Sequence, residues 1–395
     1  MRAFGLPGMD PLLAIVWKNC VDQADWTKVG NAIVLSEAKE FIQKGGRLRL
    51  RDILFATMMC GATNPRDKVY ALRGICKDAD NAALIPDYSK TVQQVYNETA
   101  RYLLSESDPL RILGAAGIGS ARSVEGLPSW VPDWSPRVHA PLSAGYNAAD
   151  KSEQSISISA VQNILTVAGM HADELKETGS VLANPALVRS THAESARNFI
   201  REYLWYEEAR ILATESANNP YTDGKPLSEA LWRTLVGDII DHTRPAPPEY
   251  GKYYQEYMTL RKETMHILER AAELENESLI QNDNSLVPRE ELAQWRKTDC
   301  DVRLASTFRP SSFAQTFLCN SPGFYWTCSG ACYARRMICI FKGARVPFLL
   351  RQNAEVGIRG TSTQTYLLVG ECYIHGMMDG EMMKGVEHFQ EFNIQ

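Results

Sequence analysis

Apolar and polar side chains follow different periods in different parts of the chain. Between Ser89 and Leu104 the apolar side chains recur every three or four positions, which is the spacing of an amphipathic helix. Thr91 and Gln94 match the capping box with which many helices begin. We therefore predict a helix over 89–104. Its inward face comprises Val92, Val95, Tyr96, Thr99, Tyr102 and Leu103.

Two regions have the pattern of β-strands. Residues 155–169, SISISAVQNILTVAG, alternate polar and apolar side chains and then become apolar, which predicts a strand or hairpin before Gly169. The last part of the chain contains RRMICIFKGARVPFLLRQ and then TYLLVGECYIHGMMDGE, two apolar runs separated by a charged loop. These runs predict paired strands.

Helical patterns occupy the first 50 residues and the region 185–300. The first helices should end at Gly45 and Gly46. The later region contains ESARNFIREYLWYEEARILA and EALWRTLVGDIIDH, and residues 262–279 should form a solvated amphipathic helix. Residues 105–150 are rich in Pro, Gly and Trp, so we expect an ordered but irregular loop there.

These elements together predict an α+β fold. Helical N-terminal and middle segments should pack with a C-terminal mixed or antiparallel sheet. The strand near Leu165 should contribute to that sheet.

Net charge limits the classes of binding partner that the chain can have, and the cysteine pattern indicates the cellular compartment. The chain has 395 residues with a net charge of -5, so it has no general attraction to nucleic acid or anionic membranes. Its first residues fit neither a secretory signal nor a mitochondrial presequence, and no apolar run reaches the roughly 20 residues of a membrane span. The nine cysteines are scattered, which is typical of reduced thiols, and we predict a cytoplasmic protein. The clustered Cys319, Cys328, Cys332 and Cys339 lack the paired spacing of a zinc site.

The first stretch with candidate chemistry is NPRDKVYALRG. Arg66 and Asp67 could act as a clamp and an acid, but such a site needs a convergent partner. We favour a structural corner in which these charges pair locally or cap a short helix, while Val69, Tyr70 and Leu72 pack inward.

The second candidate is LPSWVPDWSPR, residues 127–137. Its prolines stiffen the loop, and its tryptophans supply a large apolar area that is either buried or used for recognition. We predict that Trp130 and Trp134 are buried and that Asp133 accepts hydrogen bonds from nearby backbone N–H groups or from an arginine.

The third candidate is the segment 370–381. Glu371, His375, Asp379 and Glu381 could bind a metal or transfer protons if their side chains converged. Neighbouring residues in a strand point to opposite faces, so convergence is not required. We predict no metal site, and we expect His375 and Asp379 to orient the turn through local hydrogen bonds.

Familiar catalytic motifs are absent from the sequence. It contains no GxGxxG after a strand, no GxxxxGK[ST], no HExxH and no GxSxG. We therefore expect no cofactor, assign no catalytic residue, and favour a protein without enzymatic activity.

Several blocks together resemble the fungal heterokaryon incompatibility (HET) domain proteins. In order they are NPRDKVYALRGI, IPDYSKTVQQVYNETARYLL, LPSWVPDWSPR, LTVAGMHADEL, EALWRTLVGD, GARVPFLLR and YLLVGECYIHGMMDGE. The resemblance covers the region that follows the HET domain, from about residue 51 onward. The family's TIR-like N-terminal domain carries Ser-Tyr-x-Trp-Gly and Cys-Ile-Asn-Gln blocks, which this sequence lacks apart from a faint echo at Cys20.

The resemblance implies a division into four parts. Residues 1–50 would be a remnant helical N-terminal segment, and 51–184 a HET-like post-domain core that carries the PSWVPDW loop. Residues 185–300 would be a helical segment and 301–395 a C-terminal β-rich segment.

The leading functional hypothesis is a truncated HET-like protein that acts as an interaction or regulatory module in fungal non-self recognition. Its expected partner is a protein, with a small molecule as the alternative ligand. The rival hypothesis is a secondary-metabolism enzyme that performs a pericyclic or dehydration step in a shaped pocket, because such chemistry leaves no motif. A deep apolar pocket lined by Trp130, Trp134 or His375 would favour the enzyme. A third hypothesis is a decayed fragment without independent function.

Overall fold

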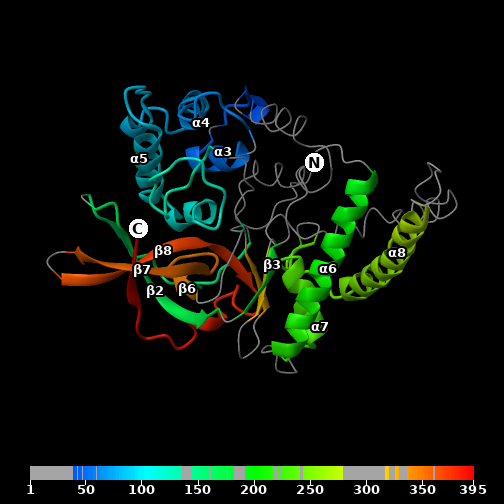
Figure 1. The fold of residues 1–395 in the computed structure, drawn as a ribbon. Helices are drawn as coiled ribbons and strands as arrows, with labels where there is room; N and C mark the ends of the chain where they lie inside the picture. Colours follow the sequence, from blue (N-terminus) through cyan, green and yellow to red (C-terminus); the bar gives the residue numbers. More distant parts are fainter. Residues whose placement is uncertain are drawn as a thin grey trace.

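The computed structural model places a helical layer on a β-barrel, with a second group of helices beside the barrel (Figure 1). It describes residues 39–135, 142, 145–181, 192–278, 316–319, 325–328 and 336–395, with gaps at 42, 47, 59, 161, 176, 217–220, 222–223, 241–242 and 359–360. The helices expected before residue 39 and beyond residue 278 lie outside this part. So do the side chains of Cys319, Cys328 and Cys332.

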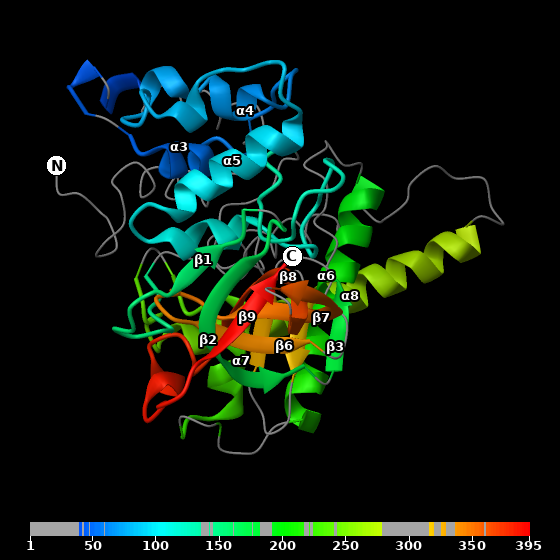
Figure 2. The same ribbon diagram turned by 90° about the vertical axis from the view of Figure 1, so that its left-hand side faces the viewer.

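The helical layer is built from α3 (Leu50–Ala56), α4 (Asp67–Tyr70) and α5 (Val92–Leu104), with short 3-10 turns between and after them. Both ribbon views show these helices together on one side of the barrel (Figures 1 and 2). The 3-10 turns are η1 (Arg73–Ile75), η2 (Ala82–Leu84) and η3 (Pro109–Ala115).

Helix α5 begins as its sequence predicts. Thr91 Oγ1 accepts a hydrogen bond from Gln94 N at 3.2 Å, and the Gln94 side chain accepts one from Thr91 N at 2.8 Å. The predicted capping box is therefore confirmed. Most of the predicted inward face is buried in the core that the helical layer shares with the barrel, with Val92 and Tyr102 only partly buried against it.

The barrel is a closed ring of β2 (Leu165–Glu174), β6 (Met337–Phe341), β7 (Phe348–Ile358), β8 (Thr361–Ile374) and β9 (Gln390–Ile394). Gly169 in β2 demonstrates the closure, since it faces Phe341 of β6 on one edge and Gln390 of β9 on the other. Strand β9 also pairs with β8, in parallel, whereas the other pairs in the ring are antiparallel. A closed ring leaves no open sheet edge.

Aromatic side chains fill the barrel. The rings of Phe341 and Phe348 stack with centroids 5.2 Å apart, and Phe392 of β9 lies 5.8 Å from Phe341. Tyr366 of β8 contacts Phe392 at 5.6 Å. The helical layer and the barrel interior share one apolar core, so the two parts stabilise each other.

The sheet extends beyond the ring on two sides. The short β1 (Ile156–Ile158) pairs with β2 in an antiparallel hairpin. From the far end of β8 the sheet continues through β5 (Tyr325–Cys328) and β4 (Thr316–Cys319) to β3 (Glu177–Val181). A last 3-10 turn, η4 (Glu381–Met383), precedes β9.

The second group of helices comprises α6 (His192–Ser216), α7 (Leu227–Leu235) and α8 (Tyr250–Ser278). They come between β3 and β4 in the sequence, where α6 lies against β3 and β4 and α7 against β5. These helices have a core of their own, centred on Tyr206, Trp232 and Tyr257.

The predicted α+β class is therefore confirmed, and so is the membership of the strand near Leu165 in a mixed sheet. That strand does not end at Gly169, however. It continues to Glu174, because Gly169 lies where β6 and β9 both pair with β2. The expected irregular region 105–150 also contains the 3-10 turn η3.

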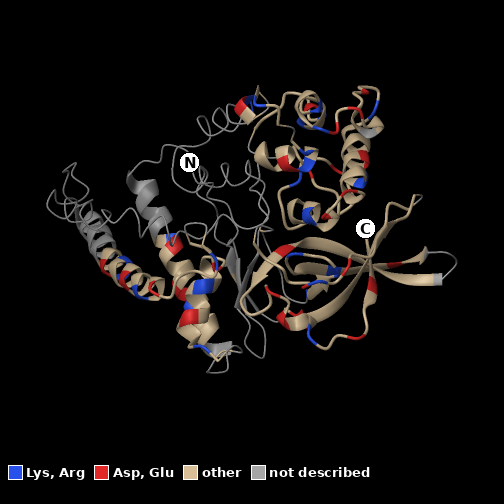
Figure 3. Cartoon of the chain, turned by 180° about the vertical axis from the view of Figure 1, so that it is seen from behind, with Lys and Arg blue, Asp and Glu red and all other residues tan. Residues whose placement is uncertain are grey.

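Charged residues of both signs are interspersed over the described helices rather than separated into faces (Figure 3). Among the described residues, no helix combines the length and the apolar character that crossing a membrane requires.

Candidate functional site

Arg66 and Asp67 hold the segment that leads into α5. Arg66 Nη1 donates to the carbonyl oxygens of Tyr88 at 2.6 Å and Lys90 at 2.8 Å, and Asp67 accepts from the Tyr88 hydroxyl at 2.6 Å. Arg66 occupies the N-cap position of α4, but no side chain caps this helix. The expected corner is therefore present, with Val69, Tyr70 and Leu72 buried. Its charges do not cap the turn, but Arg66 Nε bonds locally to Asn64 Oδ1 at 3.1 Å, and both charges also bind the segment 88–90.

The PSWVPDW loop is buried, as predicted. Trp130 and Trp134 are 0% and 2% exposed, and Trp130 Nε1 donates to the carbonyl oxygen of Asn163 at 2.8 Å. Asp133 accepts hydrogen bonds from three backbone N–H groups, as the sequence also predicts. These donors are Ser123 at 2.6 Å, Val124 at 2.8 Å and Ser135 at 2.9 Å.

Tyr96 of α5 joins the first two candidate stretches. Its hydroxyl lies 2.9 Å from the carbonyl oxygen of Pro65 and 3.0 Å from Ser135 Oγ. Its ring meets Trp134 edge-on at 5.0 Å. Both stretches are thus parts of the packing between the helical layer and the barrel.

Glu371 in β8 is a buried carboxyl group. One of its oxygens accepts from the backbone N–H of Leu142, whereas the other, Oε2, is buried without a hydrogen-bond partner. Burial raises the pKa of Glu371 to about 8, and the Leu142 N–H and the charge of Arg111 oppose this shift only partly. The group is therefore largely a neutral acid at neutral pH.

His375 follows the end of β8 and contacts two tyrosines. Its Nδ1 lies 3.2 Å from the hydroxyl of Tyr373, and its carbonyl oxygen accepts from the Tyr221 hydroxyl at 2.9 Å. The first contact is local, as predicted, while the second ties the turn to the segment before α7.

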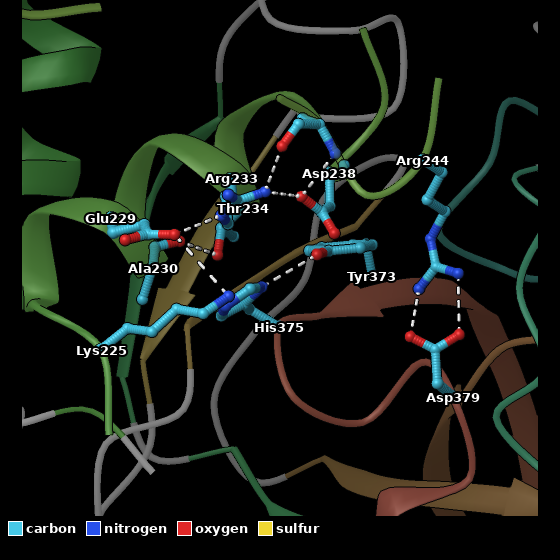
Figure 4. A network of polar contacts seen from close by, with 12 residues as sticks. Lys225, Glu229, Ala230, Arg233, Thr234, Asp238, Arg244, Tyr373, His375 and Asp379 are labelled. Carbon is cyan, nitrogen blue, oxygen red and sulfur yellow. Dashed lines mark hydrogen bonds and ion pairs between the residues drawn. The ribbon is translucent and has the colours of Figure 1, made fainter. Parts of the chain in front are cut away.

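Asp379 binds a partner far away in the sequence. Arg244 Nη1 and Nη2 donate to the two Asp379 carboxylate oxygens at 2.7 and 2.6 Å, as Figure 4 shows. This pair replaces the local role expected of the Asp379 side chain. Only the backbone N–H of Asp379 bonds locally, to Glu381 at 2.7 Å.

Arg244 connects this turn to the loop 145–154. Its guanidinium group lies 4.6 Å from the ring centre of Tyr146 and donates to the carbonyl oxygen of Gly145 at 2.9 Å. The Tyr146 hydroxyl donates to the carbonyl oxygen of Gly237 at 2.6 Å. The contacts of Arg244 and Tyr146 fix the start of the loop to the segment after α7.

A second arginine organises that segment internally. Arg233 of α7 binds Glu229 at 2.9 Å and Asp238 at 2.5 Å (Figure 4). It also donates to the carbonyl oxygen of Ala246 at 2.7 Å. Because its charge is compensated by two carboxylates, this buried guanidinium has a structural role.

Two turns of the barrel hold the loop 145–154 on its other sides. Backbone N–H groups of Asn147 and Ala148 donate to Met378 and Arg345, at 2.8 and 3.0 Å. Gly380 and Gly343 have φ angles of +82° and +76°, and a Cβ at either position would lie within 3.0 Å of Asp150 or Gln154. Both turns therefore need glycine for the backbone angle and for the close approach.

An open hollow of about 800 Å³ lies beside this loop. Its lining comes from Asp108 just before η3, from the loop and from the turn between β6 and β7, and is mostly polar. The lining residues include Asp108, Tyr146, Asp150, Glu153, Gly343 and Arg345. None of the eight residues nominated from the sequence lines this hollow.

The described residues contain no group of three or more His, Cys, Asp and Glu side chains placed to bind a metal. Glu371 and His375 are buried with separate partners, and Asp379 pairs with Arg244, so the acidic C-terminal segment does not converge. Among the cysteines whose side chains the structure describes, Cys60, Cys76, Cys339 and Cys372 are free thiols.

The closed ring built around β2, β8 and β9 agrees with a comparison against known families. The Het-6 beta-barrel domain matches residues 162–394, which is more than half of the chain and includes every strand of the ring. The chain belongs to the Het-6 beta-barrel family. The resemblance to HET proteins is thereby confirmed.

A curated relative supports the same family. The Het-6 barrel chain is 24% identical over 356 residues to heterokaryon incompatibility protein 6, OR allele, from Neurospora crassa. The match covers 82% of this chain and 50% of the relative, so the chain spans about half the length of that protein. No solved structure matches the Het-6 barrel chain.

Sequence patterns found the buried loops of the Het-6 barrel chain but missed the hollow. Arg244 and Tyr146 lie in short segments with no motif, whereas Arg345 lies in the GARVPFLLR block. The partners of all three residues are far away in the sequence. Gly343 and Gly380 were the sequence signals that could have indicated this site. A glycine between a strand and a polar segment indicates a tight turn or a place where another part of the backbone comes close.

Proposed function

We propose that this Het-6 barrel chain is an interaction or regulatory module in fungal non-self recognition and has no catalytic site of its own. The observation that carries this proposal is that the residues predicted from the sequence as pocket residues are buried, whereas the hollow is lined by other residues. Trp130, Trp134 and His375 are buried in packing contacts, whereas the hollow is open and polar. A wide polar surface suits association with a protein better than enclosure of a small substrate.

The family supports the same assignment, because the matched relative is named as a heterokaryon incompatibility protein. The four-part division of the chain remains a prediction. The described strands β2 and β3 precede the helices α6–α8, and β6–β9 follow them, so the helical segment is an insertion within the barrel sequence.

One observation favours the rival enzyme. Glu371 has an unpartnered oxygen and a raised pKa, a combination that also occurs in catalytic acids. Glu371 does not line the hollow, however, and its bonded oxygen faces the backbone of Leu142. We therefore propose a structural role for this acid.

The test uses the purified full chain and strains that express it with an affinity tag. Chemical cross-linking followed by mass spectrometry should identify a protein partner, and the purified pair should bind saturably with defined stoichiometry. A copurified nucleotide, turnover of a nicotinamide dinucleotide, or conversion of a small-molecule substrate would contradict the proposal and favour an enzyme. Variants of Glu371 would then test whether turnover depends on that acid.

A further inference from the structure

The hollow lies where three separate parts of the chain meet. Asp108 precedes η3 of the helical layer, residues 146–154 form the loop, and Gly343 and Arg345 belong to the turn between β6 and β7. A ligand in this hollow would therefore contact the helical layer and the barrel at the same time. Its volume of about 800 Å³ is within the range of ligand sites, but its lining is more polar than that of most small-molecule pockets.

The guanidinium group of Arg345 has N–H donors beyond the one that faces its ion-pair partner. Its Nε lies 3.0 Å from an Asp108 carboxylate oxygen, and its side chain is 34% exposed. Among the described residues, Asp108 provides the only ion pair to this guanidinium, and no side-chain hydrogen bond completes its coordination. A guanidinium group can donate to two acceptors at once, so Arg345 retains capacity for a carboxylate that a ligand brings.

The lining also carries charge of the opposite sign. Asp150 and Glu153 are exposed, and neither forms an ion pair within the described part of the chain. Lys151 between them is exposed as well. A ligand with only negative groups would be attracted by Arg345 and repelled by Asp150 and Glu153, and a ligand with only positive groups would experience the reverse. Charge arrangement of this kind selects partners more than it adds affinity.

We infer that this hollow binds a peptide segment of a partner protein that carries an acidic and a basic side chain a few positions apart. The acidic side chain would face Arg345, and the basic one would face Asp150 and Glu153. Side-chain amides of Asn147 and Gln154 in the lining can bind the peptide backbone. This inference rests on the proposed interaction function, whose partner it describes.

The probe is a synthetic dodecapeptide of Ser and Gly with one Glu and one Lys four positions apart and a photo-crosslinking residue between them. Two control peptides carry two Glu or two Lys at the same positions. Binding to the full chain is measured by thermophoresis at low salt, and cross-links are mapped by mass spectrometry. The mixed-sign peptide should bind at least ten-fold more tightly than either control and should cross-link to the loop 145–154 or the turn 343–345.

Variants then test the two halves of the site. Arg345→Gln and the double variant Asp150→Asn/Glu153→Gln should each weaken binding of the mixed-sign peptide at least ten-fold. Arg345→Glu should instead favour the peptide with two Lys. Lys342→Gln is the matched control, since Lys342 lies in the same turn but contacts Phe389 and does not line the hollow. Thermal melting of every variant separates loss of binding from loss of folding.

Equal binding of the three peptides, cross-links elsewhere, or unchanged affinity in folded Arg345→Gln would each overturn the inference. A protein partner that binds wild type and Arg345→Gln equally would overturn it while leaving the proposed function intact. Peptide binding at the hollow, together with catalytic turnover by the chain, would support the site and contradict the proposed function.

Discussion

Arg244 and Asp379 are 135 positions apart, yet their side chains form a two-pronged ion pair with both distances below 3 Å. Asp379 is 54% exposed, whereas Arg244 is 11% exposed and also stacks on Tyr146. The two partners are therefore unequal, because the arginine has more contacts that do not depend on the pair.

Removing the carboxylate should cost little. We expect Asp379→Asn to lower the free energy of unfolding by about 0.5 to 1 kcal/mol, the range of a partly exposed ion pair. Arg244→Ala should cost about 2 to 3 kcal/mol, because it also removes the contacts with Tyr146 and Gly145. Urea denaturation of both variants measures the difference, and equal losses would contradict the unequal roles.

Trp134 should be essential for stability. Replacing this buried ring with alanine is expected to cost about 3 to 5 kcal/mol, because it leaves a cavity beside Tyr96. Trp134→Phe should retain much of the stability and serves as the control. If Trp134→Ala melts like the wild type but no longer binds the partner, Trp134 is a recognition residue instead.

Arg66 should order the segment before α5. We expect Arg66→Ala to cost about 1 to 3 kcal/mol, since it leaves the carbonyl oxygens of Tyr88 and Lys90 without their donor. Arg66→Lys should recover only part of the loss, because an ammonium group cannot reproduce the planar fork of guanidinium. Exchange of the backbone amide hydrogens of residues 88–95 should accelerate in both variants. Unchanged exchange rates would contradict the role of Arg66 in ordering this segment.

Glu371 should make stability depend on pH. Its pKa is raised from 4.5 to about 8 in the folded chain, so between these values the unfolded chain releases a proton that the folded chain retains. The free energy of unfolding should therefore fall as pH rises through this window, with a limiting slope of about 1.4 kcal/mol per pH unit. Below pH 4.5 and above about pH 8 this contribution should be flat.

The matched variants for this prediction are Glu371→Gln and Glu381→Gln. The first should reduce the pH dependence of unfolding, and the exposed Glu381 should leave it nearly unchanged. Denaturation at half-unit steps of pH provides the measurement. An identical pH profile for wild type and Glu371→Gln would show that Glu371 is ionised in the folded state.

His375 should act through packing and hydrogen bonding rather than through a metal. We expect purified wild type and His375→Ala to contain no stoichiometric metal, and the variant to melt at a lower temperature because Tyr373 loses its contact at 3.2 Å. Elemental analysis and calorimetry are the measurements. Tightly held metal that disappears in His375→Ala would overturn this prediction and support the enzyme hypothesis.

Local signals in the sequence predicted the parts of the fold that neighbouring residues determine. The capping box of Thr91 and Gln94, the burial of Trp130 and the bonds to Asp133 depend on short segments with strong preferences. Periodicity likewise predicted a strand or hairpin where β1 and β2 pair, although not where β2 ends.

Long-range contacts were not predictable in the same way. Nothing near Asp379 specifies Arg244, and the loop 145–154 has no pattern that places it between the turns at Gly343 and Gly380. The hollow arises from that placement, so its residues could not be nominated from spacing alone.

The double pairing of β9 also constrains how the protein can fold during synthesis. Thr166 and Asn393 are 227 positions apart, and the ring cannot close until both have left the ribosome. Until then β2 and β8 each have an unpaired edge that can associate with another chain. The growing polypeptide should therefore depend on chaperones until β9 has emerged, and nascent chains arrested before residue 390 should be more sensitive to protease in the barrel than chains that include β9.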